Sequence, residues 1–397
     1  MISKVLLALL ALIVAATIGG GYGKERVEAS GDQEATKQTG SSEGSPQRIA
    51  EDRVVYGTSF VNPLVEISGA VYIGQKSFVA GNTVLKASGG QRIEIGNQTN
   101  AQDNVAVKAL KRGTTVDDET SLAHQAIVKN SEIGDFVFVG FNARAENSTL
   151  EDGAFVLHGA RVENVTVPEN AFVGVGQVVD KQSEADALPT AEEATEEFRR
   201  EVLEVNEEFA EGYIELYKEE GEEALTGIGP NPETSFNPKE IEPDVPEDLA
   251  VGRFVRIVGD VRIGEDSEVG KRSAIRADEG APIVIGENAD IGKRVTFHAL
   301  KGTQLKVGER LTAGDDAVLH GPLEVGDNLR VGERGVVFRC NVGNDVTVGD
   351  GAIIAGPVGK GGEPKLEIPD GTNIPDGAVI TGQKELDGVL ERQEQRK

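Results

Sequence analysis

The stretch Ile283-Val284-Ile285-Gly286 shows a pattern that runs through the second half of the chain, a small apolar residue followed by glycine. The pattern returns in Val261-Arg262-Ile263-Gly264, Val269-Gly270, Ile291-Gly292, Val307-Gly308, Val325-Gly326, Val331-Gly332, Val342-Gly343 and Val348-Gly349. Its step of about six residues predicts a triangular coil of about three short strands per turn, with the apolar residue inside and glycine near the corner. Such a coil is a parallel β-helix, which in this repeat class is normally left-handed.

The first half of the chain repeats the pattern less cleanly. Its copies are Ile67-Ser68, Val71-Tyr72-Ile73-Gly74, Val79-Ala80, Ile93-Glu94-Ile95-Gly96, Ile133-Gly134 and Val139-Gly140. We therefore predict an all-β fold with one helix, made of two left-handed parallel β-helix domains at residues 50–182 and 250–385. The composition agrees, because Trp is absent and Gly reaches 50 residues, as expected of many tight turns and slender apolar side chains.

A helix is predicted between the two domains, at residues 183–220. Its apolar residues recur at helical spacing, so one stripe can pack on the flank of a β-helix. They are Phe198, Val202, Val205, Phe209 and Leu216. Prolines from Pro230 to Pro246 then predict an extended interdomain linker at 221–249. Residues 386–397 are expected to form a short charged tail, and no long helix is expected after the second domain.

The N-terminus indicates export. Residues 1–24 include an apolar run from Val5 to Ile18, which has the size of a signal-peptide core and is short for a membrane span. We expect an extracellular, periplasmic or cell-surface protein, with an uncleaved N-terminal anchor as the alternative. Residues 25–49, rich in Ser, Gly, Gln and Glu, are expected to form a disordered tether.

Charge and cysteine content restrict the possible binding partners and the means by which the fold is stabilised. The net charge of −27 argues against nucleic acid and against an anionic membrane surface as partners. The lone cysteine, Cys340, excludes an intrachain disulfide framework, so an exported chain must rely on its core.

Several motifs resemble those of the γ-class carbonic anhydrases, trimeric enzymes with a left-handed β-helix fold. The second half contains Ile275-Arg276-Ala277-Asp278-Glu279-Gly280-Ala281-Pro282-Ile283, a His-Ala-Leu motif at His298 and a His-Gly-Pro motif at His320. The first half contains Asn100-Ala101-Gln102-Asp103 and Ser121-Leu122-Ala123-His124-Gln125. The resemblance covers most of residues 50–385, and it implies that carbon dioxide and bicarbonate are the substrates and that the chain is a trimer-like homo-oligomer.

The resemblance also implies a metal site divided between the two halves. In the family, one subunit supplies the histidines of His-Ala-Leu and His-Gly-Pro, and a neighbour supplies the histidine of Ser-Leu-Ala-His. Here His298 and His320 occupy the first two places, and His124 occupies the third. Zinc is the expected metal, with iron or cobalt as alternatives, because three neutral imidazoles leave an open position for a water whose pKa falls to about 7.

Neither half can form the three-histidine site with itself. At the two positions that correspond to His298 and His320, the first half has Lys108 and Lys129. At the position that corresponds to His124, the second half has Asp315. The opposite interface would bring the two lysines toward Asp315, although they could equally be solvated charges. Asp315 could also serve as a third ligand beside two histidines in a site built by second domains alone.

Strict threefold symmetry conflicts with the composite site. Three chains would form one ring of first domains and one of second domains, and His124 would then not meet His298. Side-by-side packing of the two domains within one chain, or assembly with another γ-class chain, would bring the histidines together.

The remaining site residues follow from the same resemblance. Glu279 matches a carboxylate that relays the proton, with an interface ion pair as the alternative, whereas Lys301 stands where some members have a second shuttle glutamate. Gln102 and Asn100 match residues that orient the bound hydroxide or the substrate. Three further residues have supporting places: Arg276 and Asp278 in an interface ion pair, and Asn206 just outside the ligand shell.

Three functions are compatible with these motifs. We expect an exported zinc-dependent carbonic anhydrase in which hydroxide attacks carbon dioxide. A noncatalytic γ-carbonic-anhydrase-like assembly protein and a hexapeptide-repeat acyltransferase are the alternatives, although an acyltransferase needs only one histidine as base. His158, the fourth histidine, matches no ligand position and is expected to be structural or exposed.

Overall fold

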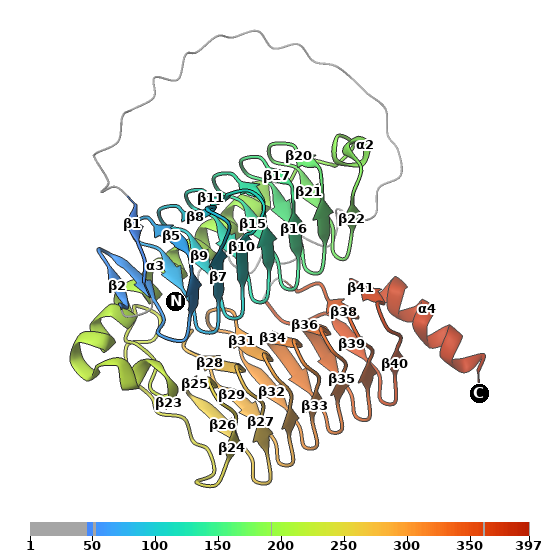
Figure 1. Ribbon diagram of the computed structural model, residues 1–397. Coiled ribbons are helices and arrows are strands. Elements are labelled where there is room, and N and C mark those ends of the chain that lie inside the picture. Colours follow the sequence, from blue (N-terminus) through green and yellow to red (C-terminus); the bar gives the residue numbers. More distant parts are fainter. Residues whose placement is uncertain (1–45, 51–52, 192, 360–361, 397) are drawn as a thin grey trace.

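The computed structural model describes residues 46–50, 53–191, 193–359 and 362–396. The signal or anchor predicted at 1–24 lies outside this part of the chain, as does most of the tether predicted at 25–49. Two β-helices lie side by side, the first coloured blue to green and the second yellow to red (Figure 1). Within the described residues, no helix is both long enough and apolar enough to span a membrane.

The first β-helix consists of three sheets. Its first two strands pair antiparallel with later strands, and after them strands that lie three places apart along the chain pair in parallel. One sheet contains β1 (Gln47–Arg48), β5 (Ala70–Ile73), β8 (Arg92–Ile95), β11 (Thr114–Val116), β14 (Glu132–Ile133), β17 (Thr149–Leu150) and β20 (Thr166–Val167). A second contains β2 (Val55–Tyr56), β3 (Ser59–Val61), β6 (Phe78–Val79), β9 (Asn100–Ala101), β12 (Ser121–Leu122), β15 (Phe138–Val139), β18 (Phe155–Val156) and β21 (Phe172–Val173). The third contains β4 (Glu66–Ser68), β7 (Val84–Ala87), β10 (Ala106–Ala109), β13 (Ile127–Lys129), β16 (Arg144–Glu146), β19 (Arg161–Glu163) and β22 (Val178–Val179).

The second β-helix repeats this construction. Two of its sheets are joined because β34 (Val318–Val325) and β36 (Val336–Val342) each continue around a corner. One face has β23 (Gly227–Gly229), β25 (Arg256–Gly259), β28 (Ala274–Ala277), β31 (Thr296–Ala299), β38 (Ile353–Ala355) and β41 (Val379–Ile380), and the next has β26 (Val261–Ile263), β29 (Ile283–Ile285), β32 (Leu305–Val307) and β39 (Leu366–Ile368). The separate third sheet has β24 (Ala250–Val251), β27 (Glu268–Val269), β30 (Asp290–Ile291), β33 (Thr312–Ala313), β35 (Arg330–Val331), β37 (Thr347–Val348) and β40 (Asn373–Ile374).

Parallel register stacks the apolar residues of successive coils inside each β-helix. Val107 of β10 lies opposite Leu85 of β7 and Val128 of β13, and all three side chains are fully buried. Each β-helix has its own continuous apolar core. The prediction of two parallel β-helix domains with a long helix after the first is therefore confirmed.

The repeated glycines have a different role from the one expected at the corners. A Cβ on Gly286 would lie 2.7 Å from the backbone of Gly308 in the next coil, so glycine lets the coils stack closely. At the corners, the left-handed backbone conformation is adopted by asparagines such as Asn82 and Asn142, whose φ angles are 60° and 55°, as well as by other glycines such as Gly159. Asparagine tolerates this conformation better than most side chains.

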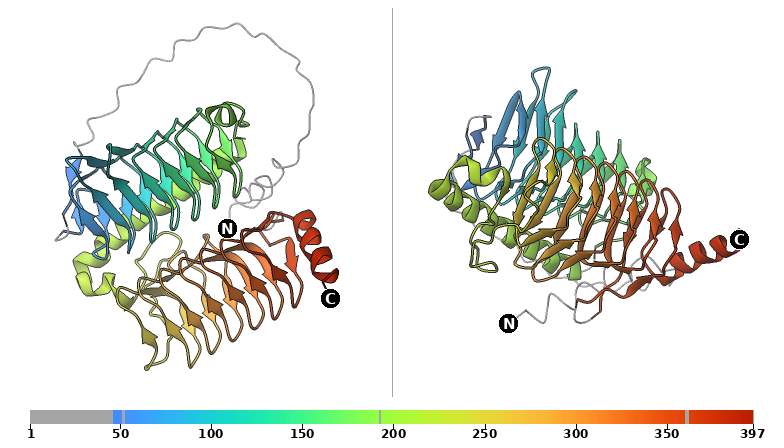
Figure 2. Two further views of the ribbon diagram at one scale, coloured as in Figure 1. Left: turned by 45° about the vertical axis from the view of Figure 1, so that its right-hand side comes forward. Right: turned by 90° about the horizontal axis from the view of Figure 1, so that it is seen from below.

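Helices connect and cover the two β-helices. The short α2 (Gln182–Ala185) precedes the long α3 (Glu193–Glu220), which runs along the first β-helix beside the second (Figure 2). Phe209 and Tyr213 of α3 pack against Phe60 and Phe78 of the first β-helix, with Tyr213 stacked 5.2 Å from Phe60. The Phe209 ring centroid also lies 5.3 Å from the Arg276 guanidinium of the second β-helix, so the helix contacts both domains.

Two segments differ from their predicted form. The linker predicted at 221–249 contains a 3₁₀ helix, η2 (Glu222–Leu225), and β23, which already pairs with β25 of the second β-helix. The charged tail predicted at 386–397 lies largely within α4 (Gln383–Glu394). This helix forms because Leu386 and Val389, three positions apart, are both buried against the core of the second β-helix.

Candidate metal centre

Three histidines from the two domains meet in one place. His124 follows β12 of the first β-helix, whereas His298 and His320 lie on neighbouring strands β31 and β34 of the second and are paired in register. Their ligand atoms all lie within 4.8 Å of one another. The three side chains are almost completely buried, at 1 to 3% exposure.

A row of amide side chains holds the two domains together around this group. Gln125, next to His124, donates hydrogen bonds through Nε2 to the backbone carbonyls of Arg294 (2.7 Å) and Ala317 (3.1 Å). Asn82 donates to the Phe254 carbonyl at 2.9 Å. These hydrogen bonds attach a corner of the first β-helix to the second β-helix, and they position His124 beside the other two histidines.

The outward ring nitrogens of two histidines have hydrogen-bond acceptors. Nε2 of His298 lies 3.2 Å from Oδ1 of Asp278, and Nδ1 of His320 lies 2.9 Å from the Gly321 carbonyl. Because a carbonyl can only accept, Nδ1 of His320 carries the proton and Nε2 keeps its lone pair. The same reasoning leaves the lone pair of His298 on Nδ1, which lies 3.3 Å from Nε2 of His124.

The donor set fits a divalent metal ion. Burial lowers the pKa of His124 to about 4 and that of His320 well below its ordinary value, so both rings are neutral at pH 7. Buried lone pairs that converge within 4.8 Å are poorly compensated without a cation. Neutral imidazoles fixed by carboxylate and carbonyl acceptors are the usual ligands of zinc.

An ion-pair network lies directly behind the ligands. The Arg276 guanidinium contacts Asp103 of the first domain at 2.7 Å and Asp278 at 2.9 Å. Burial alone would raise the pKa of Asp278, but Arg276 and His298 hold that pKa below its ordinary value. Tyr213 of α3 donates its hydroxyl to Asp278 at 2.7 Å. Arg276 and Asp278 thus lie at the interface between the domains.

Asp103 has a role that sequence reasoning did not assign. Its Oδ2 lies 3.4 Å from Nδ1 of His124 and also accepts from Arg276. Asp103 was visible in the Asn100–Asp103 motif, but nothing local to that motif indicates that its carboxylate contacts a histidine. Tyr213 was likewise visible in the sequence without an assigned role.

The other predicted site residues surround a pocket of about 460 Å³ that both domains line. Gln102, Asn206 and Glu279 line this pocket together with His298 and His320. Oε1 of Glu279 lies 3.5 Å from Nε2 of His298, and burial raises the pKa of Glu279 to about 7.

Asn100 lies behind this pocket rather than in its wall. The side chain is buried and donates through Nδ2 to Ser121 Oγ at 2.8 Å, so it supports the β12 end that positions His124.

Aromatic rings close one side of the centre. Phe141 of the first domain stacks on His320, with the ring centroids 4.8 Å apart, and on His158 at 4.3 Å. His158 accepts a hydrogen bond from the Phe141 backbone at 3.1 Å, and burial lowers its pKa to about 3. The fourth histidine is thus part of the packing around the centre and is absent from the group of converging ligands.

The lysines and Asp315 do not meet within the chain. Lys108 and Lys129 are register neighbours on β10 and β13, and Lys129 pairs with Glu146 at 2.9 Å. Asp315 pairs with Lys293 at 3.6 Å. The third ligand position that Asp315 could have filled is taken by His124 in this arrangement.

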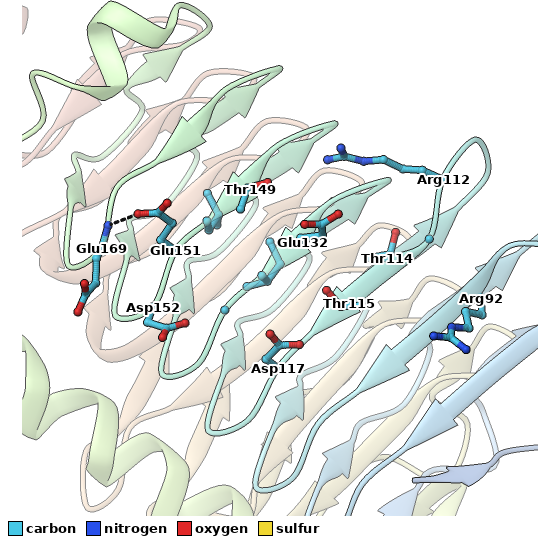
Figure 3. Close-up of a pocket in the computed structure, with 14 residues that line it drawn as sticks. Arg92, Arg112, Thr114, Thr115, Asp117, Glu132, Thr149, Glu151, Asp152 and Glu169 are labelled. Carbon is cyan, nitrogen blue, oxygen red and sulfur yellow. Dashed lines mark hydrogen bonds between the residues drawn. The ribbon is translucent and has the colours of Figure 1, made fainter. Parts of the chain in front are cut away.

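A larger hollow, of about 680 Å³, lies over β8, β11, β14 and β17 of the first β-helix. Figure 3 shows that its wall is a row of acidic and hydroxyl side chains, among them Asp117, Glu132 and Asp152. Glu151 accepts a hydrogen bond from the Glu169 backbone at 3.0 Å within it. No histidine lines this hollow, so it has no part in the metal centre.

Comparison with known proteins gives two relatives, and no family model matches the chain. The carboxysome assembly protein CcmM of Nostoc sp. is 28% identical over 181 residues, which are 41% of this chain and 30% of that protein. The carbonic anhydrase of Methanosarcina thermophila is 28% identical over 186 residues, which are 42% of this chain and 72% of the relative. The chain thus spans less than a third of the CcmM relative.

Solved structures with a detectable likeness include hexapeptide-repeat transferases. One from Anaplasma phagocytophilum shares 21% identity with a TM-score of 0.28, and the match covers 38% of this chain and 91% of the chain in that structure. A putative acetyltransferase of Bacillus cereus shares 18% identity with a TM-score of 0.25, and the match covers 39% of this chain and 87% of the chain in that structure. With TM-scores this low, these structures carry no weight on activity. The carbonic anhydrase relative, together with the parallel β-helices, confirms the resemblance to the γ-class carbonic anhydrase family.

Proposed function

We propose that this chain is an exported zinc-dependent carbonic anhydrase whose metal site is composed from both of its domains. The observation that carries the proposal is the convergence of His124, His298 and His320 within 4.8 Å, in a buried place reached by a pocket. When bound, a zinc ion on three imidazoles acts as a Lewis acid that lowers the pKa of water to about 7. Iron or cobalt would suit the same ligands.

The pocket suits a small apolar substrate that becomes an anion. Phe138, Phe198 and Leu300 supply an apolar wall that can hold carbon dioxide and exclude bulk water. Gln102 and Asn206 supply amide groups that can orient the substrate oxygens by hydrogen bonds. Asn100 supports this arrangement from behind through Ser121.

Glu279 is the first acceptor of the proton that hydration releases. Its carboxylate lies at the metal side of the pocket, 3.5 Å from His298. A carboxyl group whose pKa is about 7 can take up a proton and release it again at neutral pH. Glu279→Gln should therefore reduce hydration by about 10²-fold or more while zinc stays bound.

Metal content and hydration, measured on the same preparations, test the proposal. Zinc-loaded wild type should hydrate carbon dioxide in stopped-flow assays, and His298→Ala should lose both zinc and activity. Asp315→Asn is the matched control, because it changes a partly exposed side chain that pairs with Lys293 and lies outside the ligand group. A wild-type protein that binds zinc but shows no hydration above that of free zinc would refute the enzyme proposal.

An assembly role is the second candidate, because one relative is named as a carboxysome assembly protein. This role predicts that the chain forms a complex with another γ-class chain, or with copies of itself, whether or not zinc is present. Sedimentation of the apo and zinc-loaded protein separates it from the enzyme. An acyltransferase is the weaker alternative and would require binding of an acyl-carrier cofactor, which calorimetry with coenzyme A can test.

Export is proposed from the sequence alone. The apolar run at Val5 to Ile18 has the length of a signal-peptide core. Fractionation of cells that express the full chain should find the protein outside the cytoplasm, either free or held by an N-terminal anchor. Deletion of residues 1–24 should retain it inside the cell.

A further inference from the structure

The metal pocket has a second acidic group besides Glu279, and that group comes from α3. The helix covers the pocket with Phe198, Glu201, Val202, Val205 and Asn206, opposite the turn that follows β31 of the second domain. Glu201 therefore lines the same 460 Å³ space as the histidines, although it lies outside every motif that the sequence suggested.

The Glu201 carboxylate has no bonded partner within the described part of the chain. Its Oε2 is shielded from solvent and makes no hydrogen bond. Other glutamates of α3 are bound, for example Glu207, which pairs with Lys76 at 2.9 Å. Glu201 is half-buried, and a shielded carboxylate oxygen without a hydrogen bond is destabilising, so stability does not explain its position at the pocket.

The charges around Glu201 come from both domains. On α3, Glu197 and Glu204 are its acidic neighbours, and across the pocket the Lys301 ammonium faces it. The Lys301 ammonium lies over the Phe236 ring, 4.8 Å from its centroid. Burial first, and then Glu197 and Glu204, raise the pKa of Glu201 to about 7.

We propose that Glu201 is the outer proton-relay residue of this chain, which receives the proton from Glu279 through pocket water and delivers it to solvent buffer. The proposal rests on the proposed carbonic anhydrase function. Hydration of carbon dioxide consumes one water and yields bicarbonate and one proton. Glu279 takes up this proton, Glu201 accepts it next, and an external buffer base removes it, so both carboxylates return to their starting state.

Two variants of α3 test the relay. Glu201→Gln removes the carboxylate with little change of shape, and Glu196→Gln removes the same charge from the exposed side of the helix, where Glu196 pairs with Arg200. Both proteins should keep the zinc content and melting temperature of wild type. In weak buffer, Glu201→Gln should lower the hydration rate by about tenfold or more, and high imidazole should restore it, whereas Glu196→Gln should have no such effect.

A second readout does not depend on turnover. Glu279 and Glu201 should both titrate near pH 7, so carbon-13 NMR of carboxyl-labelled protein should show two such glutamate signals in wild type and in Glu196→Gln. Only one of the two should remain in Glu201→Gln. Glu201→Asp keeps a carboxylate, and should recover part of the rate that Glu201→Gln loses in weak buffer.

Failure of the relay and failure of the enzyme proposal give different results. An active wild type combined with an unaffected Glu201→Gln in weak buffer overturns the relay alone. A wild type that binds zinc without hydrating carbon dioxide overturns both. Persistence of both signals near pH 7 in Glu201→Gln also overturns the assignment of one of them to Glu201.

Discussion

Nε2 of His124 lies 3.3 Å from Nδ1 of His298, although 174 positions separate the two residues in the chain. One histidine belongs to the first β-helix and the other to the second. The metal centre therefore exists only while the two domains are packed together, and metal binding and domain packing must stabilise each other.

The composite centre predicts which substitutions remove the metal. His124→Ala leaves two imidazoles, so the zinc content should fall from about one per chain to near zero, as it should for His320→Ala. Asp315→Ala should retain zinc, because Asp315 pairs with Lys293 away from the ligands. Metal analysis after dialysis measures this. Retention in His124→Ala with loss in Asp315→Ala would instead indicate a site built by second domains alone.

The buried ion-pair network should dominate the stability of the interface. Arg276→Met would leave Asp103 and Asp278 buried without their cation, and we expect a loss of about 3–5 kcal/mol in the free energy of unfolding. Arg262→Met is the control, since Arg262 pairs with Asp260 at the surface and should matter by less than about 1 kcal/mol. Urea unfolding of both variants gives the comparison, and equal losses would contradict the role of the network.

Stability should fall between about pH 4 and pH 6 because of the acidic hollow of Figure 3. Asp117 is exposed to solvent, but partial desolvation of its carboxyl group, and then the charges of Asp135, Asp118 and Asp152, raise its pKa from 3.8 to about 6. The folded chain thus keeps a proton that the unfolded chain has already lost, so unfolding becomes easier as the pH rises through this range.

Asp117→Asn should remove part of that decline. Because Asp117 is exposed, screening should keep the difference below about 1 kcal/mol, and added salt should reduce it further. Thermal melts at pH 4 and pH 7 measure the effect, with Asp248→Asn as a surface control of the same charge change. A decline that is identical in wild type and Asp117→Asn would exclude this source.

Glycine substitutions should have opposite effects in the coils and in the last helix. Gly286→Ala would place a Cβ 2.7 Å from the Gly308 backbone, so the coils must separate and the melting temperature should fall by several degrees. Gly388 lies within α4, where an added Cβ meets only the flexible end of Arg392 at 3.4 Å. Gly388→Ala should stabilise the protein by up to about 1 kcal/mol through helix propensity.

Some features of the fold were predictable because they are local. The apolar residue at each six-residue step, such as Ile283, points inward whatever the rest of the chain does, since a short strand alternates its faces. The helix at α3 could be predicted from its apolar spacing. The helix α4 was missed because its apolar residues, Leu386 and Val389, are few among charged neighbours. Only their burial against the core of the second β-helix distinguishes them from residues of an exposed tail.

The two β-helices and the three candidate histidine ligands could be predicted from the sequence, because coil geometry and ligand chemistry depend on residue type and short spacing. The folded structure was needed to show that His124 meets His298 and His320 and that Asp103 lies behind His124. It was also needed to show that Glu201 lines the same pocket as His298 and His320. These contacts join residues of separate domains or elements. They depend on how two folded surfaces fit, through bonds such as those of Gln125 to the second domain, and no local pattern specifies that fit.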